Sequence, residues 1–230
     1  MSTQRLFWRW FLQRHGEAGI TLVEVLVAGI IGVLVVLAGG YALVTNLRVD
    51  RELSSAAIQR NLQTRALEYI SSEVRQANLI YAPNNTPNLC SSYTRVLGLQ
   101  TTVNGSNRNI VYAVGNANNP WRGDRVLYRC GPPIDTSTGR YSSGSDVEEV
   151  ILDGLSSATL VANSNGCGAV PTAYAVSSSN TAGLRAFFRT ASNVVNTNSA
   201  QILLGMQIDR GIQGNATSCA SIVASNRSTP

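Results

Sequence analysis

The stretch "HGEAGITLVEVLVAGIIGVLVVLAGGYALV", His15–Val44, decides the fold of this chain because it holds a near-continuous apolar run from Ile20 to Val44. A helix of this length, at about 1.5 Å per residue, would extend about 37 Å and exceed the roughly 30 Å hydrocarbon core of a bilayer. The run nevertheless carries one carboxylate, Glu24. Because an ionised acid at membrane depth costs on the order of 3 kcal/mol, its presence needs a physical explanation.

Composition divides the 230-residue chain into four parts. Residues 1–19 are basic and aromatic, residues 20–47 are almost wholly apolar, and residues 48–80 have the one-sided apolar pattern of an amphipathic helix. Residues 81–230 are rich in Asn, Ser, Thr and Gly and are long enough to bury a core of their own. We therefore predict a leader, a membrane helix, the continuation of that helix, and a globular head.

The charges before the apolar run predict its orientation. Arg5, Arg9 and Arg14 precede the run, and positively charged flanks stay in the cytoplasm, so everything after Val44 is expected outside. The net charge of the chain is +5, and the part beyond the first nineteen residues is too weakly basic for a general nucleic-acid-binding surface.

Four cysteines, Cys90, Cys130, Cys167 and Cys219, all follow the apolar run. None belongs to a C-x-x-C pair, and the only histidine is His15, so the pattern argues against a zinc site. An even number of cysteines in a polar domain beyond a membrane segment predicts two disulfides in an oxidising compartment.

We predict the pairs Cys90–Cys130 and Cys167–Cys219. Cys90 lies in a loop just past the expected helix end, and Cys130 ends an expected strand. Cys167 lies in a loop, and Cys219 lies in a C-terminal tail with little apolar content. Each bridge would close a loop of about 40 to 50 residues, worth roughly 4 kcal/mol. The nested pairing, Cys90–Cys219 with Cys130–Cys167, is an open alternative.

Two ordinary interpretations of the apolar run are also open. A cleaved secretory signal peptide would have a shorter apolar core without acids, although Ala38-Gly39-Gly40 offers a weak cleavage site that leaves Tyr41 first. A plain signal anchor accounts for the length and orientation of the run but leaves Glu24 unexplained.

A third interpretation comes from "GITLVE", Gly19–Glu24, which resembles the processing site of the type IV pilin family. The resemblance implies that a prepilin peptidase cuts after Gly19, that the new first residue Ile20 is N-methylated, and that Glu24 is the family's glutamate at the fifth mature position. Two features depart from the family pattern: the first mature residue is often Phe, and a basic residue is frequent where Glu17 stands. The glycine and the glutamate of the pattern are both present.

The resemblance also implies a role for Glu24 in assembly. Cleavage before Ile20 creates a positive amine one helical turn away, and in the family the glutamate of an incoming subunit pairs with the N-terminal amine of its neighbour. Because an unpaired charge is costly in a low dielectric, such pairing favours one axial register between subunits. The helix dipole also favours a carboxylate at this end. The competing interpretation is an acid tolerated at the membrane interface.

Small residues within the run suggest close packing and a weak point. Ala28 and Gly32 are four residues apart, as in many helix contacts in membranes. The adjacent Gly39 and Gly40 lower helix propensity by roughly 2 kcal/mol, and we predict that the helix melts at this hinge when the subunit leaves the membrane. Tight packing alone is the alternative explanation.

The whole sequence predicts an α+β fold in which the long N-terminal helix packs on a mainly antiparallel β head. No proline occurs between Ile20 and the expected helix end near Leu79, and "APNNTPN" (82–88) follows. An apolar stripe within 53–77 is expected to face the head, while charged residues such as Glu73 face solvent. Short apolar runs between turn residues predict seven strands: 95–103, 109–114, 125–130, 147–155, 158–163, 184–190 and 201–209.

Two clusters in the head suggest other chemistry, and each has a simpler interpretation. The acids of 146–153 offer oxygen ligands for calcium, but their spacing matches no EF-hand loop and favours a solvated strand edge. The run "WRGDRVLYR" (121–129) combines arginine with aromatic residues, as a DNA-contacting surface does, but alternate residues of a strand face opposite ways. No catalytic constellation is recognisable, so we predict neither an enzyme nor a cofactor.

Three strand patterns in order, "IVYAV" (110–114), "RVLYRC" (125–130) and "EVILDGL" (149–155), resemble PilW-type minor pilins and J-type minor pseudopilins. The resemblance implies a minor type IV pilus subunit that helps to initiate assembly or lies at or near the tip. A minor pseudopilin of a type II secretion system is the alternative, and a membrane-anchored binding protein or enzyme is a third interpretation.

The same resemblance implies partners and a location. The expected partners are other pilins and minor pilins, the prepilin peptidase, the inner-membrane assembly platform and the membrane itself. The expected location is the inner membrane before assembly, with the head outside the cytoplasm, and the pilus or cell surface afterwards.

Overall fold

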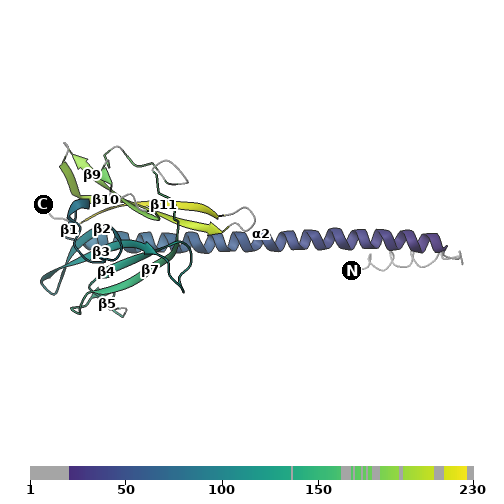
Figure 1. Cartoon of the computed structure of the whole chain (residues 1–230), viewed down its shortest axis with the longest axis horizontal. Coiled ribbons are helices and arrows are strands. Elements are labelled where there is room, and N and C mark those ends of the chain that lie inside the picture. Colours follow the sequence, from purple (N-terminus) through teal and green to yellow (C-terminus); the bar gives the residue numbers. More distant parts are fainter. Residues whose placement is uncertain are drawn as a thin grey trace, which may run out of the picture. The chain divides into compact units, whose positions relative to one another are not determined.

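The computed structural model describes residues 21–135, 137–161, 167, 169–171, 173–174, 176–177, 182–191, 194–209 and 215–226. The chain divides into two compact units, Met1–Arg51 and Glu52–Pro230. The first unit contains the apolar half of a long helix, and the second contains the other half together with an antiparallel sheet (Figure 1).

Helix α2, Leu22–Gln76, has 55 residues and contains no proline. Its first turn is capped by Thr21, whose side-chain Oγ1 accepts a hydrogen bond from the backbone N–H of Glu24 at 3.3 Å. An uninterrupted helix agrees with the sequence, because the residues of α2 that most disfavour a helix interior are a few glycines.

The helix ends earlier than the sequence predicts. Helix α2 stops at Gln76, three residues before Leu79. The backbone N–H of Asn78 donates to the carbonyl oxygen of Gln100 at 2.7 Å instead of continuing the helix. Strand β1, Leu79–Ile80, follows and pairs with β2. A tertiary contact, which helix propensity does not register, therefore sets this boundary.

The second unit is built on a nine-stranded antiparallel sheet. Its strands follow the order β1-β2-β3-β4-β7-β10-β9-β8, and β11 pairs with β10. The strands after β1 are Thr94–Val103 (β2), Ser106–Asn116 (β3), Arg125–Gly131 (β4), Val147–Leu155 (β7), Val176–Ser177 (β8), Leu184–Ala191 (β9), Val194–Asp209 (β10) and Asn215–Ser225 (β11). A separate ribbon pairs Ile134–Asp135 (β5) with Arg140–Tyr141 (β6), and a 3-10 turn spans Pro83–Asn85 (η1).

Six of the seven predicted strands are confirmed, since β2, β3, β4, β7, β9 and β10 contain the predicted segments. The prediction for 158–163 is wrong, because among its described residues only Thr159 forms a bridge, to Ala182. Leu160 in this segment is fully buried in a small cluster with Phe187 and Leu203. Its apolar character therefore reflects burial of a loop rather than strand pairing.

Strand β11 replaces the predicted C-terminal tail. It pairs with β10 over its whole length, from Asn215 opposite Asp209 to Ser225 opposite Ser199. Its residues are mostly small, "NATSCASIVAS", and a prediction based on large apolar runs does not recognise them. Small residues suffice here because Ala224 is buried in the main core.

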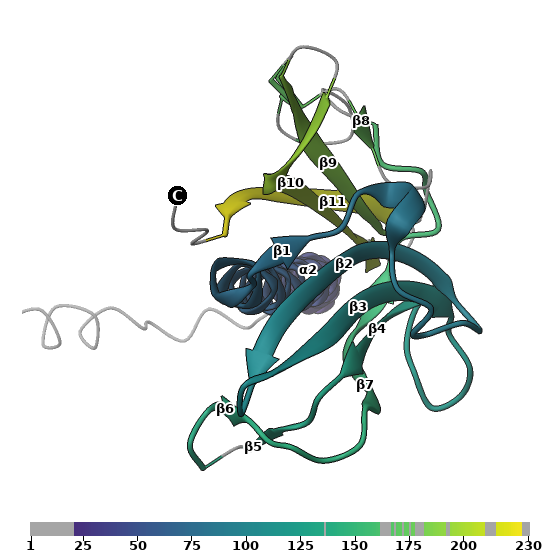
Figure 2. The ribbon, with the colours of Figure 1, turned by 90° about the vertical axis from the view of Figure 1, so that its left-hand side faces the viewer.

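The sheet curls around the part of α2 that belongs to the second unit. Strands β7 and β10 are joined by one residue pair, Leu155 with Met206. The strands on the two sides of this junction lie on opposite sides of α2 (Figure 2). Gly183 permits the close approach, because its φ is +84° and an added Cβ would lie 2.9 Å from the Cβ of Leu155.

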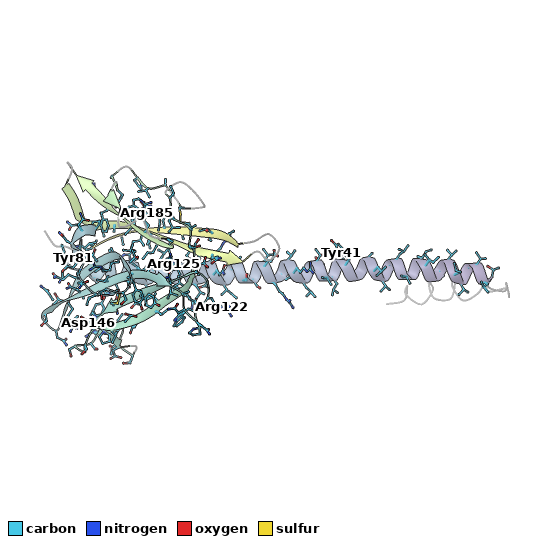
Figure 3. The ribbon with its side chains drawn as sticks, viewed as in Figure 1. Tyr41, Tyr81, Arg122, Arg125, Asp146 and Arg185 are labelled. Carbon is cyan, nitrogen blue, oxygen red and sulfur yellow. A yellow bond between two sulfur atoms is a disulfide. The ribbon has the colours of Figure 1, made fainter. Side chains whose placement is uncertain are left out.

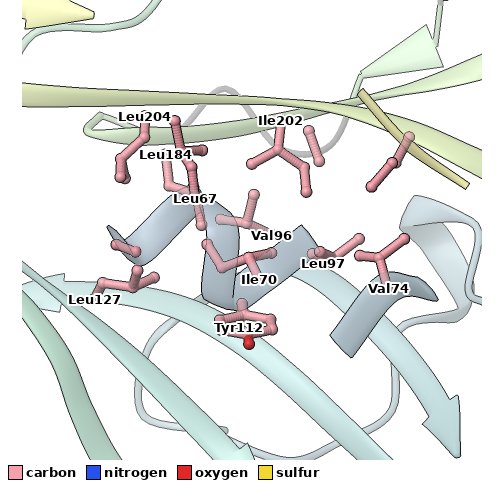
Figure 4. Close-up of a cluster of buried hydrophobic side chains, with 14 of the residues drawn as sticks. Leu67, Ile70, Val74, Val96, Leu97, Tyr112, Leu127, Leu184, Ile202 and Leu204 are labelled. Carbon is pink, nitrogen blue, oxygen red and sulfur yellow. The ribbon is translucent and has the colours of Figure 1, made fainter. Parts of the chain in front are cut away.

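The main core fills the space between α2 and the two halves of the sheet (Figure 4). Leu67, Ile70 and Val74 form the helix side of this core and recur every three or four residues, as on one helix face. Their buried neighbours are Leu97, Tyr112 and Leu127 from one half of the sheet and Leu184, Ile202 and Leu204 from the other.

The predicted apolar stripe is buried only in its second part. Leu53 and Leu62 are 64% and 41% exposed, whereas burial on α2 begins at Gln63. Glu73, which was expected to face solvent, is only 2% exposed. The prediction of a solvent-facing Glu73 is therefore wrong, and its contacts explain why.

Two disulfides connect Cys90 with Cys130 and Cys167 with Cys219. The sequential pairing is confirmed, and the nested alternative is wrong. The first bridge joins the loop after η1 to β4, with the two Cα atoms 5.7 Å apart. The second joins Cys167 to β11, with the two Cα atoms 4.7 Å apart, so each bridge fixes a loop to a strand.

The core predicts a contrast between two isoleucines of the same helix. Ile70→Ala should lower the free energy of unfolding by about 2–5 kcal/mol, because Ile70 is fully buried. Ile58→Ala should change it by less than about 1 kcal/mol, because Ile58 is 61% exposed. Urea unfolding of the full chain in detergent measures both, and equal effects would contradict this description of the core.

Candidate functional site

The first unit presents an uncovered apolar helix. The large apolar side chains between Leu22 and Val49 are 47–82% exposed. By length and composition, α2 is able to cross a membrane. Because water disfavours so much apolar surface, this half of the helix needs lipid or other protein around it.

Glu24 is the one charged residue in this segment between Thr21 and Leu47. Its backbone N–H donates to the carbonyl oxygen of Thr21 at 3.0 Å and to Thr21 Oγ1 at 3.3 Å. Among the described residues, the carboxylate itself has no hydrogen-bond or ion-pair partner. The position near the helix N-terminus is favourable for a negative charge, but it leaves the carboxylate available to another group.

Thr21 is not among the residues predicted from the sequence to matter. The signal is nevertheless present, since a threonine three residues before a glutamate at a helix start is the pattern of a capping box. The structure forms the half of that motif in which the threonine side chain accepts the N–H of Glu24. Thr21 therefore fixes where α2 begins and where Glu24 lies on it.

The other residues predicted for processing and assembly fall in two groups. Gly19 and Ile20 lie outside the described residues, so cleavage and N-methylation there are still predictions. Gly39 and Gly40 lie inside α2, which continues through them. An added Cβ at either would meet no atom within 4 Å, so contacts within the chain do not require glycine. Melting at this pair concerns an assembled state and is also still a prediction.

Glu73 is the centre of a buried polar cluster in the second unit. Its Oε1 accepts hydrogen bonds from Arg129 Nε at 2.9 Å and from the Tyr141 hydroxyl at 3.1 Å. Its Oε2 accepts one from the Tyr112 hydroxyl. Arg129 Nη2 also lies 2.9 Å from Oε1, and Arg129 is fully buried. One carboxylate on α2 is thereby joined to β3, β4 and β6.

The guanidinium of Arg129 has further contacts around this pair. Its Nη2 donates to the carbonyl oxygen of Pro132 at 3.1 Å. Its Nη1 lies 3.7 Å from the carboxylate of Glu149, within range of an ion pair. The guanidinium carbon lies 5.9 Å from the centre of the Tyr141 ring, where a cation is attracted to the aromatic face.

The electrostatics of the cluster keep the arginine charged and the tyrosines neutral. Burial alone lowers the pKa of Arg129, but the charge and hydrogen bonds of Glu73 raise the pKa above its usual value. Burial, followed by the charge of Glu73, raises the pKa of Tyr112 well above its usual value. The same two causes raise the pKa of Tyr69 to about 12.

Gln63 makes a second buried polar contact between α2 and the sheet. Its Nε2 donates to the carbonyl oxygen of Leu204, and to that of Ser218 at 3.2 Å. Gln63 therefore connects α2 to β10 and β11, whereas Glu73 connects it to the other half of the sheet. The two contacts lie ten residues apart on α2, so they fix its position in the head at two points.

The run 121–129 does not form one continuous surface. Tyr128 and Arg129 are 8% and 0% exposed, and the ring of Tyr128 stacks on Tyr93 with 3.9 Å between the centroids. Arg122 and Arg125 lie outside the core and are labelled in Figure 3. Two residues of the proposed DNA-contacting surface, Tyr128 and Arg129, are therefore buried, which argues against that interpretation of the run.

The acidic residues of 146–153 have separate partners. Asp146, labelled in Figure 3, forms a surface ion pair. Within the part of the chain that the structure describes, no three His, Cys, Asp or Glu side chains come together as metal ligands would. The partners are Arg108 for Asp146, Tyr93 for Glu148, Arg129 for Glu149 and the backbone N–H of Arg122 for Asp153.

Comparisons with family models, with curated proteins and with solved structures found no match to this chain. Function is therefore inferred from the arrangement of the described residues. That arrangement combines an apolar helix that needs covering, an acid without a partner near its start, and a head fixed to the second half of the helix.

The Glu73 cluster predicts a large effect of a small substitution. Glu73→Gln should lower the free energy of unfolding by about 3–5 kcal/mol, because it removes the closest ion-pair partner of the buried Arg129. Glu68→Gln is the matched control on the same helix, since Glu68 is exposed, and it should change stability by less than about 0.5 kcal/mol. Urea unfolding monitored by near-ultraviolet circular dichroism measures both, and equal stabilities would refute this role of Glu73.

The raised pKa of Tyr69 predicts a loss of stability in alkali. The folded state holds this proton more tightly than the unfolded chain, whose tyrosine pKa is about 10. The contribution is therefore complete below about pH 10 and is lost as the pH rises towards the folded pKa of about 12. Tyr69→Phe should flatten the fall of unfolding free energy over this interval. An unchanged slope in the variant would show that Tyr69 is not responsible.

Proposed function

We propose that this chain is a minor subunit of a type IV pilus that helps to initiate assembly or lies at or near the pilus tip. The observation that carries the proposal is the carboxylate of Glu24, which has no partner among the described residues although it belongs to a helix whose surroundings must be apolar. A helix that only crosses a membrane gains little from such a group beyond its interaction with the helix dipole. A helix that must find one register against another helix gains more.

The partner of Glu24 in this proposal is the N-terminal amine of a neighbouring subunit. Cleavage after Gly19 by a prepilin peptidase would create that amine on Ile20, one helical turn before Glu24. In the apolar interior of a filament, a carboxylate and an amine that are both unpaired cost several kcal/mol more than the pair. Only one axial offset between neighbouring helices brings the two together, so the charge pair selects the register of assembly.

The second unit fits the role of the head of such a subunit. Its two disulfides suit an oxidising compartment, where the head would lie after membrane insertion. The contacts of Gln63 and Glu73 hold the second half of α2 inside the sheet. The proposed partners are other pilins, the inner-membrane assembly platform and the membrane. Gly39 and Gly40 are the proposed point at which the helix extends on leaving the membrane.

A minor pseudopilin of a type II secretion system is the second candidate, and it would use Glu24 in the same way. The three strand patterns that resemble both kinds of subunit lie in β3, β4 and β7, which are consecutive neighbours in the sheet. Deletion of the gene separates the two candidates. Loss of pili with normal secretion supports the first, and loss of secretion with normal pili supports the second.

The proposal predicts a specific assembly defect for Glu24→Gln. The variant should insert into the membrane at least as well as the unchanged protein, because a charge is removed from an apolar segment. Its incorporation into filaments should fall about tenfold or more, because the N-terminal amine of the neighbour is left unpaired. Immunoblots of sheared filaments and of membranes measure the two quantities separately.

Glu52→Gln is the matched control, because it removes an exposed acid of the same helix outside the apolar segment. It should leave both membrane insertion and incorporation unchanged. Normal incorporation of Glu24→Gln, or an equal defect in both variants, would overturn the assembly role of Glu24.

A further inference from the structure

An open pocket of about 510 Å³ lies where β2 begins, β3 ends and β4 begins, and it shares no lining residue with the Glu73 cluster. Side chains of Tyr93, Asn116, Asn118 and Arg125 line it, and the backbone of Gly115 contributes to its wall. Arg125 is labelled in Figure 3. The assembly role proposed above does not use this pocket.

Tyr93 gives the pocket a fixed aromatic wall. Its ring stacks on Tyr128 with an angle of 5° between the planes, and its hydroxyl donates to the Glu148 carboxylate at 2.7 Å. Gly115 allows this stack, because an added Cβ there would lie 2.9 Å from Tyr128 Cε2 and closer still to Tyr93. The ring is therefore held in place before any ligand arrives, which lowers the entropy lost on binding.

The polar side chains that line the pocket are the hydroxyls of Ser92, Tyr93 and Thr94, the amides of Asn116 and Asn118, and the guanidinium of Arg125. Arg125 Nη1 donates to the side-chain oxygen of Asn116, which orients the guanidinium and leaves its other N–H groups available. Among the described residues, Arg125 forms no ion pair, and none of the residues that line the pocket is acidic. Asn118 adds an exposed amide from the loop before β4.

This combination fits one class of ligand. An aromatic ring packs against the C–H face of a pyranose, amide side chains bond its hydroxyl groups, and a guanidinium binds a carboxylate through two parallel hydrogen bonds. The volume lies within the range of small-molecule sites. We propose that the pocket binds a saccharide that carries a carboxylate, as in a uronic-acid-containing polysaccharide. A free uronide supplies the same chemistry, so the smallest probe is a single ring.

The test uses the full-length protein in detergent and ligand-observed NMR titrations with methyl β-D-glucuronide and methyl β-D-glucoside. The glucuronide should bind in about the millimolar range, and the glucoside about tenfold more weakly, because a hydrogen-bonded ion pair is lost. Arg125→Gln should reduce glucuronide binding to the level of the glucoside. Asn118→Ala should weaken both sugars by a similar factor and leaves the tyrosine stack untouched, so it tests the pocket even if Arg125→Gln fails to fold.

Arg140→Gln is the matched control, because it removes an exposed arginine on β6 that does not line the pocket. It should leave both titrations unchanged. Absence of glucuronide binding, equal binding of the two sugars, or an equal loss in Arg140→Gln would overturn the proposal. Tighter binding of a single-stranded oligonucleotide than of an oligouronide would also overturn it, because the pocket would then recognise phosphate and base rather than sugar and carboxylate. None of these outcomes depends on whether the chain assembles into a filament.

Discussion

The buried ion pair between Glu73 and Arg129 is the interaction on which the rest of the head depends. Two charges can remain inside a protein only when their geometry and hydrogen bonds compensate for lost water, and here Tyr112, Tyr141 and the carbonyl oxygen of Pro132 complete that compensation. Because Glu73 lies on α2 and Arg129 on β4, the pair permits only one rotation of the helix in the sheet. That rotation turns the apolar face of α2 into the main core, and Gln63 holds the opposite half of the sheet in place.

Glu24 and Glu73, two of the glutamates of α2, therefore pose the same physical problem with different solutions. Glu73 has its partners within the chain, so its charge specifies a fold. The carboxylate of Glu24 has none among the described residues, and it lies on a segment whose side chains are exposed and apolar. In apolar surroundings an unpaired charge is costly, and a partner charge from another molecule can offset that cost. We propose that it specifies an assembly, by the electrostatic argument that explains the head.

The sequence predicts those features that local patterns determine. Helix α2 and β2, β3, β4, β7, β9 and β10 follow from periodicity and turn residues. The even number of cysteines predicts two disulfides, and the structure decides between the sequential pairing that we favoured and the nested alternative. The burial of Glu73 escapes prediction because its partners Tyr112 and Arg129 are 39 and 56 residues away. Strand β11 is not predicted because its small residues give little strand signal. The strand predicted at 158–163 is wrong because the buried Leu160 of a loop gives the same apolar pattern as a buried strand residue. In the candidate site, Glu24 stands out as a charge in an apolar run, while Thr21 needed only the capping pattern to be recognised.

We propose that this chain is processed and assembled as a pilin-like subunit, and the mature N-terminus tests this proposal most directly. Intact-mass and N-terminal peptide measurements on protein purified from cell membranes determine where the chain begins and whether its first amine is modified. We expect N-methylated Ile20 as the first residue, which places a charged amine one helical turn from Glu24. A chain that begins at Met1, as a plain signal anchor would, or at Tyr41, as a secretory protein would, contradicts the claim and leaves Glu24 without the proposed partner.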